Sequence, residues 1–152
     1  MRAAVALVVT CLGAGAAFAQ PKAKPVETTC DVIEVSASTD KTGAIDPDIK
    51  HIEKKLSDFP AQWNVFKKLS RDSVKLDKGK PAALSLKVGS GTATLVEIVD
   101  KSKVRMAIKL DYNGKTVVNN ATVTVEAGDY VVVGHPISGS KKDGHLLAVT
   151  CK

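Results

Sequence analysis

Histidine is the residue type best suited to chemistry in this chain, and two of its three histidines lie close together. His135 and His145 flank a short loop, so a hairpin would bring their imidazoles near each other, with Asp129 or Asp143 beside them. Two imidazoles and a carboxylate can bind Zn²⁺ or Cu²⁺. The spacing matches none of the common zinc motifs, such as HxH or HExxH. His135 and His145 are therefore candidate metal ligands without a motif behind them, and His51, among lysines, is expected to face solvent.

Other patterns typical of enzymes are missing from the sequence. It contains no G-x-S-x-G motif, no P-loop and no dinucleotide-binding fingerprint, and Gly89-Ser90-Gly91 is typical of a turn between strands. The sixteen acidic residues are scattered, with no pair that the pattern assigns to a cleft. We therefore predict no catalytic residue and no cofactor, and a protein that binds rather than catalyses.

A run of cations between residues 67 and 80 is opposed by only Asp72 and Asp77. With the aromatic residues just before it, the run predicts an electropositive surface for an anionic glycan or lipid headgroup. The alternative is a solvated strand edge, where lysines discourage aggregation and the aromatic side chains belong to the core. The predicted binding residues are Trp63, Phe66, Lys67, Lys68, Arg71 and Lys75.

The start of the chain predicts export. Met1-Arg2 is positive, residues 3–17 are almost wholly apolar or small, and Ala17-Phe18-Ala19 has the A-x-A form of a signal-peptide cleavage site. Residues 1–19 are therefore predicted to be a signal peptide, and the mature protein to be periplasmic or secreted. The alternative is a lipoprotein anchored at Cys11. No later apolar run approaches the ~20 residues of a transmembrane helix, and export argues against nucleic acid as a partner.

Two cysteines remain after the predicted cleavage, and an oxidising compartment favours a disulfide between them. Cys30 opens the first strand-like segment, and Cys151 lies at the end of the last one. The alternative, a metal site with two thiolates, lacks a neighbouring histidine or cysteine to complete it. The predicted structural disulfide therefore joins Cys30 to Cys151.

Alternating hydrophobic residues predict a mainly β fold. Residues 104–110 place valine, methionine, isoleucine and leucine at every second position, and Asn113-Gly114 supplies the pair that a type I′ hairpin turn needs. Similar alternation, as in Leu84, Leu86 and Val88, recurs along the chain. We predict an antiparallel β-sandwich or small barrel with one short α-helix, as a single domain over residues 30–152 after a flexible tether at 20–29.

The predicted helix begins at Asp46, whose side chain suits the N-cap, with Pro47 at the first helical position. Apolar residues follow at helical spacing, and Pro60 ends the pattern. They are Ile49, Ile52 and Leu56. Residues 63–76 fit a helix or a strand, and their poor helix formers favour a strand.

Several of these features together resemble a group of small exported proteins of myxobacteria and related bacteria. They are Ile45-Asp46-Pro47, Phe59-Pro60, Phe66-Lys67-Lys68-Leu69, the turn Gly79-Lys80-Pro81 and the closing segment Gly144-His145-Leu146-Leu147-Ala148-Val149. The resemblance implies export and supplies no catalytic residue. We therefore predict an exported, non-catalytic cell-envelope or periplasmic domain that binds a protein or an anionic glycan; the alternative is a metal-dependent enzyme or metal-binding protein using the histidine pair.

Overall fold

The computed structural model describes residues 24, 26–59, 62–137, 139 and 141–152. The predicted signal peptide and most of the predicted tether lie outside the described residues. The strands are β1 (Glu27–Ser38), β2 (Ala44–Ile45), β3 (Val65–Asp77), β4 (Pro81–Leu84), β5 (Ser90–Asp100), β6 (Lys103–Tyr112), β7 (Lys115–Glu126), β8 (Val131–Pro136) and β9 (Asp143–Cys151). A 3₁₀ helix, η1 (Pro47–Ile52), leads directly into α1 (Glu53–Ser57).

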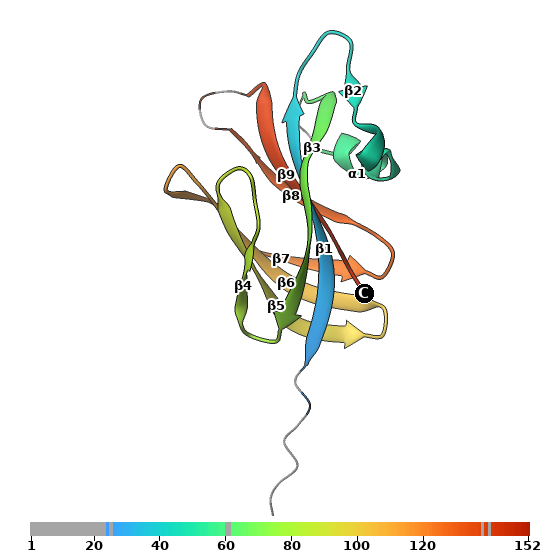
Figure 1. Ribbon diagram of the computed structural model, residues 1–152, viewed down its shortest axis with the longest axis vertical. Helices are drawn as coiled ribbons and strands as arrows, with labels where there is room; N and C mark the ends of the chain where they lie inside the picture. Colours follow the sequence, from blue (N-terminus) through green and yellow to red (C-terminus); the bar gives the residue numbers. More distant parts are fainter. Residues whose placement is uncertain (1–23, 25, 60–61, 138, 140) are drawn as a thin grey trace, which may run out of the picture.

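The strands form two sheets that pack face to face, which confirms the predicted mainly β fold and makes it a sandwich (Figure 1). One sheet has the order β2-β3-β1-β9-β8, and the other has the order β4-β5-β6-β7. All pairings between these strands are antiparallel except that of β2 with β3. The alternation in β6 has the predicted meaning, because its apolar residues Val104, Met106, Ile108 and Leu110 are all buried.

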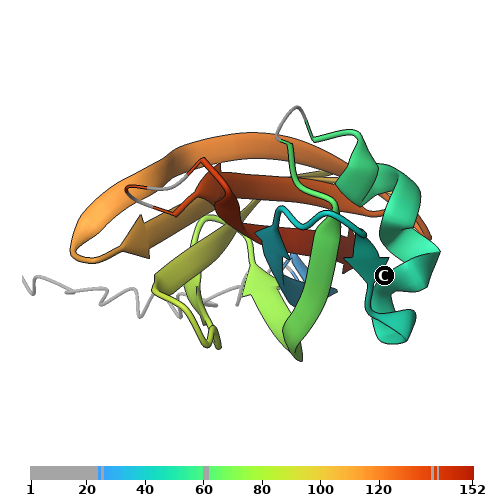
Figure 2. The same ribbon diagram turned by 90° about the horizontal axis from the view of Figure 1, so that it is seen from above.

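Two groups of buried side chains stabilise this arrangement. The first lies between the sheets and joins Val32 and Leu147 of one sheet to Leu95 and Met106 of the other. The second covers the opposite face of the five-stranded sheet, where η1 and α1 pack. Figure 2 shows this helical segment at one side of the molecule.

The helical segment starts at the predicted residue, but its first half is not the predicted α-helix. The Asp46 side chain accepts a hydrogen bond from the Asp48 N–H at 3.0 Å, as an N-cap does. The next six residues are 3₁₀ rather than α-helical. A 3₁₀ turn holds three residues, so it aligns Ile49 with Ile52, and the following α-turn adds Leu56 to the same buried face.

The structure decides three points that concern the bounds of strands. β1 begins at Glu27, so the last residues of the predicted tether belong to the sheet. Residues 65–77 form strand β3, as favoured. The strand expected to include Leu84, Leu86 and Val88 is wrong beyond Leu84, since β4 ends there. The strand ends early because the backbone amides of Lys87 and Val88 donate to the buried carboxylate of Glu34 instead of to a neighbouring strand.

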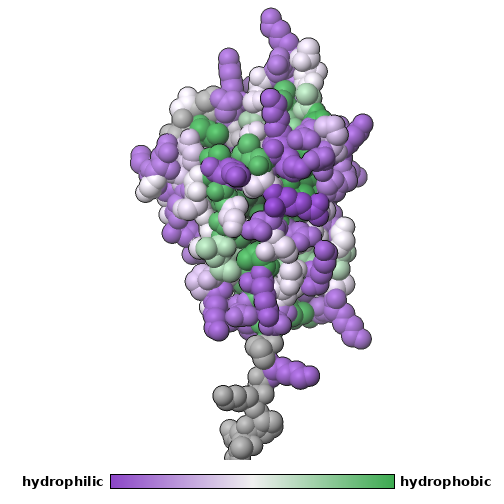
Figure 3. Space-filling view, in the orientation of Figure 1, coloured by the Kyte–Doolittle hydropathy of each residue, from purple (hydrophilic) through white to green (hydrophobic). Residues whose placement is uncertain are grey.

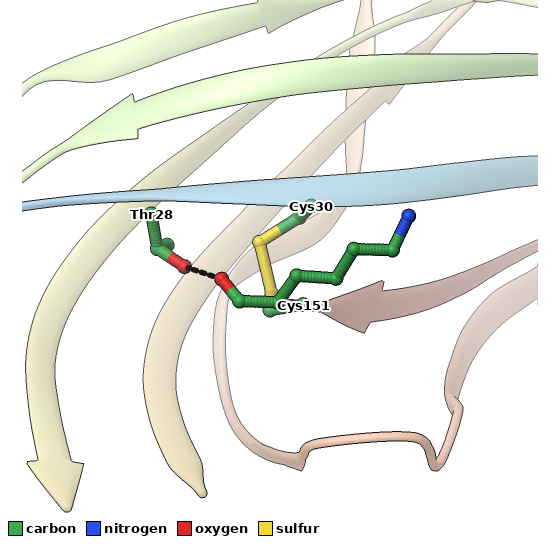
Figure 4. Close-up of a disulfide and its surroundings, with 4 residues drawn as sticks. Thr28, Cys30 and Cys151 are labelled. Atoms are coloured by element: carbon green, nitrogen blue, oxygen red, sulfur yellow. Dashed lines mark hydrogen bonds between the residues drawn. A yellow bond between two sulfur atoms is a disulfide. The ribbon is translucent and has the colours of Figure 1, made fainter. Parts of the chain in front are cut away.

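The predicted disulfide is present and joins directly opposed residues of β1 and β9 (Figure 4). Cys30 and Cys151 are both buried. Beside the bond, the Thr28 hydroxyl donates to the Lys152 carbonyl at 2.9 Å. The first and last long strands of the domain are therefore held together by main-chain, side-chain and covalent links. Among the described residues, no helix is long and apolar enough to span a membrane.

Candidate functional site

A row of polar side chains crosses the inner face of the five-stranded sheet. Ser70 on β3 lies opposite Glu34 on β1, and His145 on β9 lies opposite His135 on β8. These strands are neighbours, so the four side chains follow one another across the sheet. Glu34 is fully buried, and the exposed fractions of His145 and His135 are 2% and 6%. A polar row at this depth requires partners for each of its atoms.

Glu34 is the centre of the row and accepts four hydrogen bonds. Its Oε2 accepts from the Lys87 N–H and the Ser70 hydroxyl, both at 2.7 Å. Its Oε1 accepts from the Val88 N–H at 2.8 Å and faces His145 Nε2 at 2.8 Å. Burial alone would raise the pKa of Glu34, but these donors outweigh burial and lower it below its usual range. Glu34 is therefore a buried carboxylate.

The two imidazoles continue the row beyond Glu34. His145 Nδ1 lies 3.3 Å from His135 Nε2, and His135 Nδ1 lies 3.0 Å from the Pro136 carbonyl oxygen. A carbonyl and a carboxylate can only accept, so His135 Nδ1 and His145 Nε2 are the nitrogens that carry a hydrogen. The other two ring nitrogens face each other. The row thus runs from the Glu34 carboxylate through both imidazoles to the Pro136 carbonyl.

The surroundings of His135 disfavour a charge on its imidazole. Burial lowers the pKa of His135, and the neighbouring His145 charge lowers it further, although the hydrogen bond to the Pro136 carbonyl acts in the opposite direction. Tyr112 from the opposite sheet lies against the His135 ring, with ring centroids 5.8 Å apart. The row is thus a buried carboxylate that is bonded to His145 and extended by a second imidazole, His135.

This arrangement bears on the predicted metal site. The structure does bring His135 and His145 together, but the carboxylate that joins them is Glu34, not Asp129, which pairs with Lys55 at 2.8 Å. Among the described residues no group of three or more histidine, cysteine or acidic side chains is placed to hold a metal ion. Both nitrogens of each imidazole already have a partner within the chain.

Sequence reasoning missed Glu34, although one signal was available. On β1, Cys30 and Val32 point into the core between the sheets, and Glu34 is the next residue in that alternation. A carboxylate at an inward-facing strand position must be paired or coordinated. The residues that pair it lie 36 to 111 positions away in the chain, so the sequence could not name them.

The structure separates the aromatic residues of the predicted basic surface from its cations. Trp63 and Phe66 are buried, with exposed fractions of 8% and 3%, and pack with η1 and α1 over the outer face of the sheet. Their burial matches the alternative in which they are core residues. The aromatic side chains therefore do not form the expected surface platform.

The cations of the run up to Lys75 lie on β3, and Lys78 and Lys80 follow its end. The side of β3 that faces away from β1 pairs with β2 only at its first two residues. Several of them have acidic partners in the chain: Lys68 with Asp48, Arg71 with Asp31, Lys75 with Glu27, and Lys80 with Asp77. On the face seen in Figure 3, hydrophilic side chains dominate and hydrophobic patches between them are small. This geometry is typical of a solvated strand edge.

The outer edge of β8 has a different character. In the described part of the chain, β8 pairs only with β9 and carries no Lys, Arg, Asp or Glu. Two hollows, of about 310 and 370 Å³, lie along it. Both are lined by Phe59, which follows α1. The edge is thus an uncharged main-chain surface beside an aromatic wall.

Comparison with known proteins gives no relative: no family model, curated protein or solved structure matches the chain. The resemblance to small exported myxobacterial proteins therefore stays a prediction.

Proposed function

We propose that this protein is an exported, non-catalytic domain of the periplasm or cell envelope that binds a protein partner. The observation that carries the proposal is the open, uncharged edge of β8. Natural sheets usually protect such edges, since an unpaired row of N–H and C=O groups pairs readily with another chain. Export is supported by the buried disulfide and by the predicted signal peptide at residues 1–19.

Two observations favour this role over the other predicted functions. Every ring nitrogen of the histidine pair has a partner inside the chain, which leaves no ready base or metal ligand there. An anionic glycan would need to displace the acidic partners of Lys68, Arg71 and Lys75, and would find Trp63 and Phe66 buried. A protein partner at β8 requires neither change.

The test is capture by the purified domain, beginning at residue 20, with its disulfide intact. The immobilised domain is exposed to cell-envelope extract at low salt and then at high salt. A specific protein retained through high salt supports the proposal. The opposite result is anionic polymer alone, released by salt and no longer bound after charge reversal of Lys67, Lys68 and Arg71.

The enzyme alternative has its own test in the same preparation. Metal analysis of the purified domain should find no stoichiometric zinc or copper. Stoichiometric metal that is lost in His135→Ala would favour the metal-dependent function instead. Export is tested by fractionation of cells that express the full chain, with Gln20 expected as the first residue of the exported protein. A lipid-modified form that disappears in Cys11→Ser would establish the lipoprotein alternative.

A further inference from the structure

Among the edge strands of the two sheets, β8 has the fewest features that prevent pairing with another chain. β2 has only two residues, and β4 has four and begins with Pro81. β7 is interrupted by register shifts against β6, and its Asn120 has a positive φ of 47°. β8 has a regular register over all six residues, with Pro136 only at its last position. Bulges, prolines, short strands and charges are the usual protections, so β8 is the least protected edge.

The two hollows border β8 on the side of the sheet that Phe59 and Trp63 cover. Tyr130, Val131 and Val132 line the first hollow, and Gly134, His135 and Pro136 line the second. Successive residues of a strand point to opposite faces of the sheet. Tyr130 and Val132, two positions apart, pack on that face, so alternate side chains of a strand added to the edge would face the hollows.

Phe59 is the residue that the two hollows share. It lines both, and its ring stacks against Trp63 with centroids 6.0 Å apart. Lys55 and Asp58 complete the wall beside the first hollow, and Lys55 is neutralised by its ion pair with Asp129. The two hollows, which we call the groove, thus lie between β8 and Phe59.

The dimensions and charges of this groove define its occupant. Six strand residues extend about 20 Å, and side chains on one face repeat every second residue. The hollows are lined mainly by aromatic and aliphatic groups, which suits apolar side chains. Lys141 lines the end of the groove near Pro136, and an acidic residue of the occupant would pair with it there.

We infer that β8 binds an extended segment of a partner protein, which adds to the five-stranded sheet as a further strand. The segment is about six residues long, apolar at alternate positions and acidic at the end beside Lys141. Main-chain hydrogen bonds to β8 provide affinity, and the two hollows select the side chains. This inference rests on the proposed function of binding a protein, and it names the surface and the chemistry of the partner.

The test uses a synthetic seven-residue peptide in which valine and threonine alternate and aspartate occupies one end. Isotope-labelled oxidised domain is titrated with it and followed by NMR. We expect shifts at the β8 amides and at the Trp63 indole, and roughly tenfold slower hydrogen exchange of β8 amides in the complex. A peptide with proline at its centre should not bind, because it cannot complete the ladder.

A substitution at the edge provides the second arm. Val132→Lys places a charge beside the groove and should weaken peptide binding about tenfold or more. Val117→Lys, which adds a lysine at a 37% exposed valine on edge strand β7, should leave binding unchanged. Because Val132 is partly buried against the second core group, binding is compared only under conditions in which both variants are fully folded. Circular dichroism and unfolding curves confirm that both variants fold.

The inference is overturned if the shifts map to another strand or if Val132→Lys binds the peptide as the wild type does. It is also overturned if sedimentation shows a dimer that Val132→Lys dissolves, because a second copy then occupies the edge. If a captured protein partner binds Val132→Lys as tightly as the wild type, strand addition fails while the proposed function stands. If the peptide binds at β8 but no protein is captured from the envelope, the proposed function fails and the strand-accepting edge stands.

Discussion

Replacement of Glu34 by glutamine tests whether the buried row is a charged network. Glutamine has nearly the same shape, but it carries no charge and it replaces one acceptor oxygen with a donor NH₂ group. In the native row all four partners of this side chain are placed to donate to it. Either orientation of the amide therefore sets its NH₂ against donors.

The cost follows from those contacts. If the glutamine NH₂ points toward Lys87 and Ser70, the Ser70 hydroxyl can rotate and accept from it. The Lys87 N–H, however, loses its acceptor, and an unsatisfied buried donor costs about 1–3 kcal/mol of stability. The Val88 N–H and His145 Nε2 also exchange a charged acceptor for a neutral one, and a hydrogen bond to a charged group is worth about 1.5–3 kcal/mol. We therefore expect Glu34→Gln to lower the free energy of unfolding by at least about 3 kcal/mol, out of a total of about 5–15 kcal/mol for a typical domain.

Urea unfolding of the oxidised protein, followed by the fluorescence of Trp63, measures this loss. With a slope of about 2 kcal/mol per molar urea, the midpoint should fall by about 1.5 M at pH 7. Glu27→Gln is the control, because Glu27 pairs with Lys75 at the surface and its loss should cost at most about 1 kcal/mol.

The pH dependence of the stability difference between wild type and Glu34→Gln shows whether the charge of Glu34 is the cause. The pKa of Glu34 is lowered from its ordinary 4.5, so its stabilisation is full above about pH 4.5 and is lost as pH falls through the folded-state pKa. The difference between wild type and Glu34→Gln should therefore shrink in strong acid. A loss below 1 kcal/mol at pH 7, or a difference that is unchanged at pH 2, would refute the charged network.

Three further predictions concern the histidine, a close contact and the disulfide. Because the pKa of His135 lies below its usual 6.5, the unfolded chain takes up a proton at a higher pH than the folded protein does. The free energy of unfolding should therefore fall as pH drops from about 6.5, and in urea unfolding His135→Gln should show a weaker dependence on pH. A Cβ at Gly144 would overlap the Trp63 indole, so Gly144→Ala should cost about 1–3 kcal/mol and shift the emission of Trp63. Replacement of Cys30 and Cys151 by alanine should cost about 3–5 kcal/mol in thermal unfolding, and a loss near zero would contradict the stabilising role of this long-range link.

Local patterns predicted much of the fold because they depend on neighbours in sequence. The alternation at residues 104–110 became β6, and the Asn113-Gly114 pair became its hairpin turn, with positive φ at both residues. Asp46 caps the helical segment as its side chain predicts. Leu86 and Val88 continue an alternating pattern, yet β4 ends before them, because the Lys87 and Val88 amides bond to Glu34.

The sequence by itself determined the mainly β architecture, the place of the helix and the pairing of Cys30 with Cys151. Alternation and capping leave few choices, and of the three cysteines only these two lie beyond the predicted signal peptide. Only the tertiary structure decided that Glu34 is the carboxylate beside the histidines, that Trp63 is core, and that β8 lies at the end of its sheet. Each of these depends on strand order and on contacts between distant residues, which no local pattern encodes.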